Sequence, residues 1–413
     1  MASRSECWSV TTRRWLSSRP RVAPTYSPRP VVVPVTVSTI DVKSGRITAS
    51  GTLDLKATSL IDVSTSGLSP LGSIVATSVA TVDVTGASVL AAGGNTTLAS
   101  SSTVTSKATP GGPNLTTLPG DAGVAINVVV STAKTHVGDT SSVTATGGTL
   151  DLTAKNAVTA TTKADSTAGG AVAVGGTVAL SEVTSVTQAI IDGTATTSSS
   201  ALKVAAESTN VVTTTAKAAT KGAKKQTAAE KSAAPSKSEE TLAKYKDQST
   251  TSDGSVEVAA AVAIANVNSV TVADVASTGA QTATGSATVS SKAASSSTVT
   301  ADGSSASGGV GVGAAVGVNV GVLVNQARIA DSASVSSNGL TVSAVMPAAG
   351  KNSFVTSATS GAGASNVGVA GALATNVLVN TTVASIEGDT NSSGSGASVN
   401  ANGGDVVVES ANA

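Results

Sequence analysis

The sequence predicts an all-β protein, a parallel β-solenoid (β-helix) built from degenerate repeats of about 55 residues. From residue 367 to residue 379, Val and Leu alternate with Gly, Ala and Asn, which is the period of a β-strand. The same design occurs from residue 310, so one element has been repeated. Aromatic residues make up 1% of the chain and charged residues 12%. Val, Ile, Ala and Thr must therefore fill the core, and thin stacked coils suit such small side chains.

The first 35 residues differ from the rest of the chain. Residues 1–35 hold both Trp and many of the Arg and Pro residues, and we predict a disordered extension or a misassigned start there. Arg13 and Arg14 are similar to a twin-arginine export signal, which requires an apolar run immediately afterwards. Residues 17–20, Ser-Ser-Arg-Pro, take the place of that run. We therefore expect no export signal in this chain.

The repeats occupy residues 36–216 and 254–413. Equivalent positions are separated by about 54, 84, 54 and 57 residues; they are Val124, Val178, Val262, Val316 and Leu373. Segments with Gly, Gly-Gly or Asn-Gly between two short alternating runs recur, and we predict tight corners there. We expect Val, Ile and Leu to point inward and Thr and Ser to face water. With about 20 residues a coil, about 18 coils would form a rod of roughly 80–90 Å.

The enlarged interval has its source in residues 217–253. Composition changes there from Val and Thr to Lys, Ala and Glu, and the alternation stops. We predict an exposed Lys-rich insertion loop between two coils, with a short helical turn near Glu239 and Glu240.

The sequence offers few residues for chemistry. The single histidine, His136, is predicted to be a solvated residue at a strand end, because one His cannot build a two-His metal site. Acidic residues recur near the corners, where they could form a column of calcium ligands or serve as ordinary turn residues. These residues are Asp139, Asp192, Asp274, Asp331 and Asp389. The turn interpretation is the stronger one, and we predict no metal site.

Other functional classes also lack their signatures. Tyr245 and Phe354 are the only aromatic residues beyond residue 35, which is too few for a carbohydrate-stacking groove. We predict no catalytic residue, no cofactor site and no enzyme. Seven of the eight Arg residues precede residue 47, so the repeats carry no basic stripe for nucleic acid. The Gly-rich runs are predicted to be buried strands that do not span a membrane. Asn127, Asn266, Asn319 and Asn376 recur in the strand runs, where stacked amides would fix the register of the coils.

Residues 40–413 resemble the repeat region of large secreted bacterial adhesins of the filamentous-haemagglutinin-like and autotransporter-passenger kinds. The resemblance rests on the Gly/Ala/Val run, the Asn-containing strand, the Thr/Ser segment with Gly-Asp, and the Gly-Gly corner. It implies an elongated β-helical stalk at the cell surface. The chain lacks the export signal and secretion domain of such proteins, which favours a fragment of a longer gene.

We therefore expect a structural stalk or passenger segment of a cell-surface or secreted adhesin, which spaces and displays binding regions. The expected location is extracellular, on the bacterial cell surface. The resemblance implies host or cell-surface glycans and proteins as partners, bound by regions outside this chain or by the insertion 217–253. Two alternatives stay open: a carbohydrate-active β-helix enzyme, and a ligand-binding module that acts through the insertion.

Overall fold

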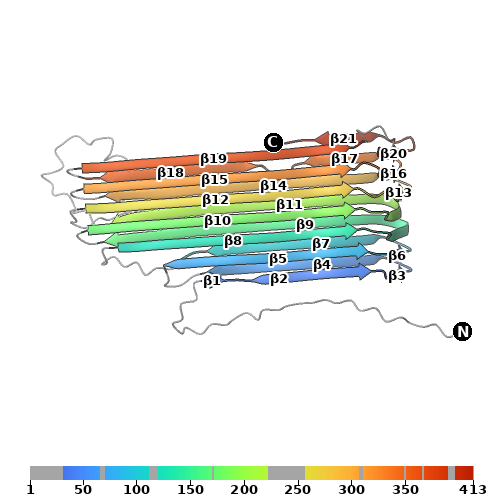
Figure 1. The fold of residues 1–413 in the computed structure, drawn as a ribbon, viewed down its shortest axis with the longest axis horizontal. Coiled ribbons are helices and arrows are strands. Elements are labelled where there is room, and N and C mark those ends of the chain that lie inside the picture. The colour runs from blue at the N-terminus through green and yellow to red at the C-terminus, as the bar shows by residue number, and fades with distance from the viewer. Residues whose placement is uncertain are drawn as a thin grey trace, which may run out of the picture.

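A computed structural model describes residues 31–65, 70–110, 120–169, 172–221, 256–306, 310–347, 350–364, 367–388 and 396–412. All elements in these ranges are β-strands, and they form two parallel sheets. In Figure 1 the strands follow one another in chain order from the blue to the red end of the stack. The coarse prediction of an all-β protein with parallel strands is confirmed.

The first sheet, sheet A, has eight strands. They are β1 (Val31–Val32), β2 (Val35–Lys43), β5 (Leu71–Thr85), β8 (Gly120–Val137), β10 (Val172–Ile191), β12 (Val256–Val275), β15 (Val310–Ile329) and β19 (Val367–Ile386).

The second sheet, sheet B, has thirteen strands, several of them short. They are β3 (Arg46–Ala49), β4 (Leu53–Thr65), β6 (Val89–Ala92), β7 (Thr96–Ala108), β9 (Ser142–Gly169), β11 (Thr196–Lys221), β13 (Ala280–Ala283), β14 (Ala287–Ala306), β16 (Ser334–Ser336), β17 (Leu340–Val345), β18 (Ser353–Gly363), β20 (Ser398–Asn400) and β21 (Val406–Ser410).

The chain alternates between the sheets, and we call each sheet A strand with the sheet B strands that follow it a level. Val178 pairs with Val124 on one side and with Val262 on the other. The row continues through Val316 to Leu373. The five positions aligned from the sequence therefore lie side by side. The expected coil of about 20 residues is wrong, because one level takes in a sheet A strand of 20 residues and a further passage through sheet B.

This arrangement changes the expected dimensions. The longest path through sheet A, from β1 to β19, crosses seven levels, which at about 4.8 Å each gives roughly 30 Å. A strand of 20 residues such as β15 extends over about 65 Å. The described part of the chain is therefore wider along its strands than it is tall, as Figure 1 shows, and the expected rod of 80–90 Å is wrong.

The orientation of the strands is the main correction to the sequence analysis. In β15 the residues between the valines, such as Gly317 and Asn319, are buried, whereas Val316 and Val318 are only partly buried. In this strand small side chains point inward and the valines point outward, although other valines of sheet A, such as Val129 and Val183, are buried. Sheet B keeps large residues inside, among them Leu150 and Leu152.

The side chains that fill the space between the sheets are bulky near the corner where sheet A strands end, and small toward the opposite end. Near the corner the core is made of bulky residues such as Leu90, Leu202 and Ile329. Further from the corner, buried Ala dominates a second cluster. There a Cβ on Gly123 would lie 2.8 Å from the carbonyl oxygen of Asp165, so glycine allows the two walls to approach.

A seam of polar side chains separates these two clusters. Ser59, Ser102 and Asn156 of sheet B lie in one row. Hydroxyls of sheet A reach between them: Ser78 lies 2.7 Å from both Ser59 and Ser102, and Ser131 donates to Asn156 Oδ1 at 2.6 Å. The seam therefore joins the two sheets through hydrogen bonds inside the core.

The recurrent asparagines do not form one ladder. Asn319 and Asn376 are paired neighbours, but Asn266 faces outward and is exposed. The buried Asn127 donates to the carbonyl of Thr161 at 3.2 Å, which links sheet A to sheet B. The expectation that these amides fix coil register by stacking is therefore wrong for the set.

The predicted turns lie at two kinds of place. The corner after each sheet A strand often holds a residue with positive φ, as at Gly86, Asp139 and Gly193. The Gly-Gly segments lie instead within sheet B, where Gly93 and Gly94 separate β6 from β7. Of the predicted insertion 217–253, residues 217–221 belong to strand β11, and the remainder lies outside the described residues. The predicted extension 1–35 lies outside them up to residue 30.

Candidate functional site

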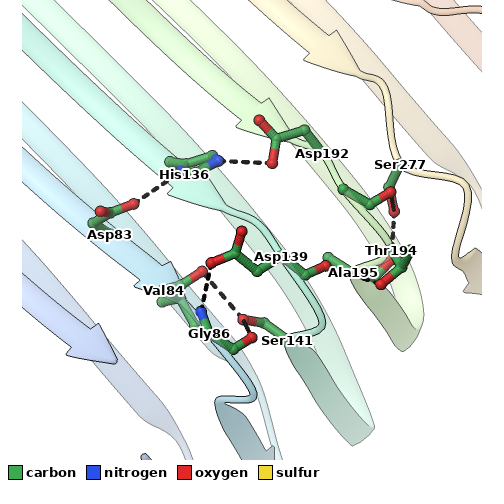
Figure 2. A network of polar contacts seen from close by, with 11 residues as sticks. Asp83, Val84, Gly86, His136, Asp139, Ser141, Asp192, Thr194, Ala195 and Ser277 are labelled. Atoms are coloured by element: carbon green, nitrogen blue, oxygen red, sulfur yellow. Dashed lines mark hydrogen bonds and ion pairs between the residues drawn. The ribbon is translucent and has the colours of Figure 1, made fainter. Parts of the chain in front are cut away.

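A group of ionisable side chains lies where sheet A strands turn toward sheet B, as Figure 2 shows. It contains His136 at the end of β8, Asp83 near the end of β5, and Asp192 just after β10. Asp83 and His136 are paired neighbours in sheet A. The parallel register therefore brings three side chains from three successive levels to one corner.

His136 bridges the two carboxylates. Its Nδ1 lies 2.6 Å from Asp83 Oδ1, and its Nε2 lies 2.9 Å from Asp192 Oδ1. With a carboxylate at each ring nitrogen, the doubly protonated imidazolium can donate both hydrogen bonds. The His136 side chain is 13% exposed, so the prediction of a solvated strand-end residue is wrong.

The charges of this group stabilise one another. Burial lowers the pKa of His136, but the hydrogen bonds to Asp83 and Asp192 together raise it above its ordinary value, against a small opposing effect of Lys134. The hydrogen bond from His136 lowers the pKa of Asp83. The arrangement therefore acts as a clamp of alternating charge across three levels, which we call the histidine clamp.

A glycine makes room for the histidine clamp. A Cβ on Gly138 would lie 2.6 Å from both His136 Nε2 and Asp192 Oδ1. Below it, Asp139 adopts positive φ and accepts a hydrogen bond from the Gly86 amide at 2.8 Å. These contacts tie the corner of one level to the corner of the level beneath it (Figure 2).

A second clamp lies on the same row of sheet A, three levels further along. The row runs from His136 through Ile190 and Asp274 to Arg328. Arg328 donates two hydrogen bonds to Asp274, at 3.1 and 2.6 Å, and its Nη1 lies 3.5 Å from Glu387. This arginine clamp again joins three successive levels.

The predicted aspartate column is divided among different roles. Asp192 belongs to the histidine clamp and Asp274 to the arginine clamp. Asp139 accepts a hydrogen bond from the backbone amide of Gly86 in the neighbouring corner, and Asp331 accepts one from the amide of Ser332 in its own corner. Asp389 lies outside the described residues. Within the described ranges, no group of three or more His, Cys, Asp or Glu residues could hold a metal ion.

The nearby hydroxyls are engaged with the backbone. Ser141 Oγ lies 3.3 Å from the carbonyls of Val84 and Gly86, and Ser277 donates to Ala195 at 2.7 Å. Neither contact is to the histidine. The chemistry that the described geometry supports at this corner is charge pairing between levels, with His136 as its titratable member.

Sequence reasoning missed both clamps, although a signal was present. Asp83 precedes His136 by 53 residues, and Asp274 precedes Arg328 by 54. These separations match the commonest spacing of the aligned positions, 54, to within one residue. A search for opposite charges one repeat apart would have found both pairs.

Comparison with known proteins adds no relative. No protein-family model matches the chain, and no similar curated protein or solved structure was found. Among the described residues, no helix is long and apolar enough to cross a membrane.

Proposed function

We propose that this chain is a structural segment of a cell-surface or secreted adhesin, folded as a parallel β-solenoid with one coil of about 54 residues for each repeat. The observation that carries the proposal is the lateral register of sheet A. Strands β10, β12, β15 and β19 pair over their whole length without an offset. Each coil is therefore a template for the next, which is the property required of a segment that sets length by repetition.

The contacts between levels support a mechanical role. Parallel backbone hydrogen bonds run the full width of the stack, and the two clamps add charged pairs across three levels each. The recurring Gly/Ala/Val runs, Asn-containing strands and Thr/Ser segments resemble the bacterial adhesin repeats named above. Such a segment holds binding regions of a larger protein at a distance from the cell.

Localisation in the organism that encodes the chain tests the proposal. Antibodies against the purified chain should label intact cells, and external protease should remove the label. A strain that lacks the gene should lose adhesion, whereas an in-frame deletion of one repeat, residues 256–309, should keep the surface label. Labelling that requires permeabilised cells would contradict the proposal.

A further inference from the structure

The outer faces of the two sheets differ in character. On sheet B the exposed positions include Thr159, Lys163 and Lys203. On sheet A they include Val130, Val178 and Val322, whose exposed fractions are 37%, 41% and 40%. Sheet B therefore presents hydroxyls and charges to the surroundings, whereas sheet A presents apolar side chains.

The outward positions of sheet A form a largely apolar patch, the valine face, of five rows that cross β8, β10, β12, β15 and β19. In-register pairing places each row on one face of the sheet. The rows are Val124, Val178, Val262, Val316 and Leu373; Ile126, Leu180, Ile264, Val318 and Thr375; Val128, Glu182, Asn266, Val320 and Val377; Val130, Thr184, Asn268, Val322 and Val379; and Thr132, Val186, Val270, Val324 and Thr381. Glu182 is the one charged residue among them.

The valine face is large. Each outward side chain covers about 4.8 Å across the strands and about 6.7 Å along them, so the five rows over five strands cover roughly 800 Å². The 18 apolar positions among the 25 account for roughly 580 Å² of this area. Apolar patches of more than a few hundred Å² mark interaction sites. About 800 Å² on each partner is the standard size of a stable protein interface.

We infer that the valine face is an interface at which a second copy of this chain packs, sheet against sheet. Two such faces can stack about 10 Å apart with their strands roughly 30° from parallel, as in β-sandwiches. The match of the patch to the size of a stable dimer favours a second copy, because the same flat surface supplies both halves of an isologous contact. The inference does not depend on the proposed adhesin role.

Most charged side chains near the valine face lie at its border. Asp83, His136 and Arg328 belong to the row at the corner end of sheet A, outside the five apolar rows. They would form part of a polar rim around an apolar centre, the usual anatomy of an interface. Glu182 is exposed next to the outward-facing Asn266 of the neighbouring strand, so its carboxylate has a polar neighbour within the patch.

Sedimentation velocity of the full chain over a range of concentrations tests the inference. The wild-type chain should form a dimer that dissociates on dilution. The double variant Val178→Lys with Val322→Lys should raise the dissociation constant by about 100-fold or more, because two lysines would lose water in each buried face. The matched double variant Thr209→Lys with Thr298→Lys, on exposed positions of the outer face of sheet B, should leave it unchanged.

A second, more conservative double variant tests the interface in case the lysine variant does not fold. Val178→Thr with Val322→Thr keeps β-branched side chains of nearly the same shape and should weaken the dimer by about tenfold. Far-UV circular dichroism should match the wild type for each variant. A wild-type chain that stays monomeric would overturn the inference, including one that binds lipid vesicles instead. Open-ended oligomers that none of these variants alters would also overturn it, because they point to pairing through the free edge of β19.

Discussion

At the residue scale, His136 links protonation to the cohesion of three levels. Its raised pKa contributes stability that is fully present below its ordinary value of 6.5 and is lost as the pH rises through the folded value. The lowered pKa of Asp83 contributes stability that is present above 3.8 and is lost as the pH falls through the folded value. The histidine clamp is therefore strongest in the mildly acidic range between these two limits.

Replacing the histidine should remove this dependence. We expect His136→Gln to lower the free energy of unfolding at about pH 5.5 by about 1–3 kcal/mol, and by less at about pH 8, because the charged hydrogen bonds exist only with the imidazolium. Urea denaturation at both pH values measures the difference. Equal losses at the two pH values would show that the ring acts only by packing.

The variant Gly138→Ala tests the same clamp while keeping the histidine. Its Cβ would displace the contact between His136 and Asp192, so the pKa of His136 should fall toward its ordinary value. Because the chain has one histidine, a single pair of ring signals in a nuclear magnetic resonance titration reports this pKa directly.

Glu257 is a second residue whose charge is controlled by its surroundings. Its side chain is fully buried at the start of β12, where Thr220 donates a hydrogen bond to Oε2 at 2.8 Å. Its Oε1 has no hydrogen-bond partner in the described part of the chain. Burial raises the pKa of Glu257 to about 7, against the opposing hydrogen bond of Thr220. The carboxyl is therefore largely neutral in mildly acidic solution.

A raised carboxyl pKa costs stability at high pH. The folded state keeps its proton as the pH rises from 4.5 to about 7, while the unfolded state has lost it, so the free energy of unfolding should fall by about 3 kcal/mol over this range. Glu257→Gln should abolish this fall and make the protein more stable than the wild type at about pH 8. Thermal unfolding across this pH range tests the prediction, and an unchanged pH profile in the variant would contradict it.

At the element scale, the strands of sheet A show how far sequence reasoning extends. Alternation correctly predicted strands and their lateral alignment, because both follow from a period of two and a repeated spacing. It did not predict which face is buried, because Val on one face and Gly or Ala on the other are compatible with either orientation. The buried positions also hold Asn127, Ser131 and Asn319, whose partners lie in the other sheet and are invisible to a local pattern.

Substitutions at inward positions should destabilise the protein more than substitutions at outward positions. Gly303 faces inward in β14, and a Cβ there would collide with the carbonyl oxygen of Ala314. We expect Gly303→Ala to destabilise the protein by about 1–3 kcal/mol through overpacking. The outward change Val316→Thr should cost less than about 1 kcal/mol. Urea denaturation compares the two variants. A larger loss of stability for Val316→Thr would show that Val316 points into the core, as the sequence analysis expected.

At the scale of the whole molecule, the height of the stack depends on the number of repeats, and its width depends on the length of the strands. Adding a repeat raises the stack by only about 4.8 Å, whereas the width of about 65 Å is set by strand length. The sequence predicted the repeat but not this shape, because the spacing of equivalent positions does not reveal how many turns the chain makes between them. The described assembly is a broad stack whose unit is the level.

Removal of one whole level should therefore be tolerated. Deletion of residues 256–309 removes β12, β13 and β14 and places β15 next to β10, in the register that β12 had. The shortened chain should keep its β-sheet circular dichroism, with a free energy of unfolding lower by about one-seventh. Deletion of residues 256–282 removes half a level and should abolish cooperative unfolding, since β14 of sheet B would then lack its partner strand β12 in sheet A. Similar behaviour of the two deletions would contradict the one-level repeat.

The polar seam between the sheets also bears on how the protein responds to temperature. Exposure of apolar surface raises the heat capacity on unfolding, and exposure of polar surface lowers it. Here the interior holds Ser78, Ser102, Ser131 and Asn156 where an ordinary core holds Leu or Phe. Calorimetry should therefore give a heat-capacity change below the usual value of about 12–15 cal/mol/K per residue. A small heat-capacity change makes the curve of stability against temperature broad and shallow, so the stack loses little of its cohesion on cooling.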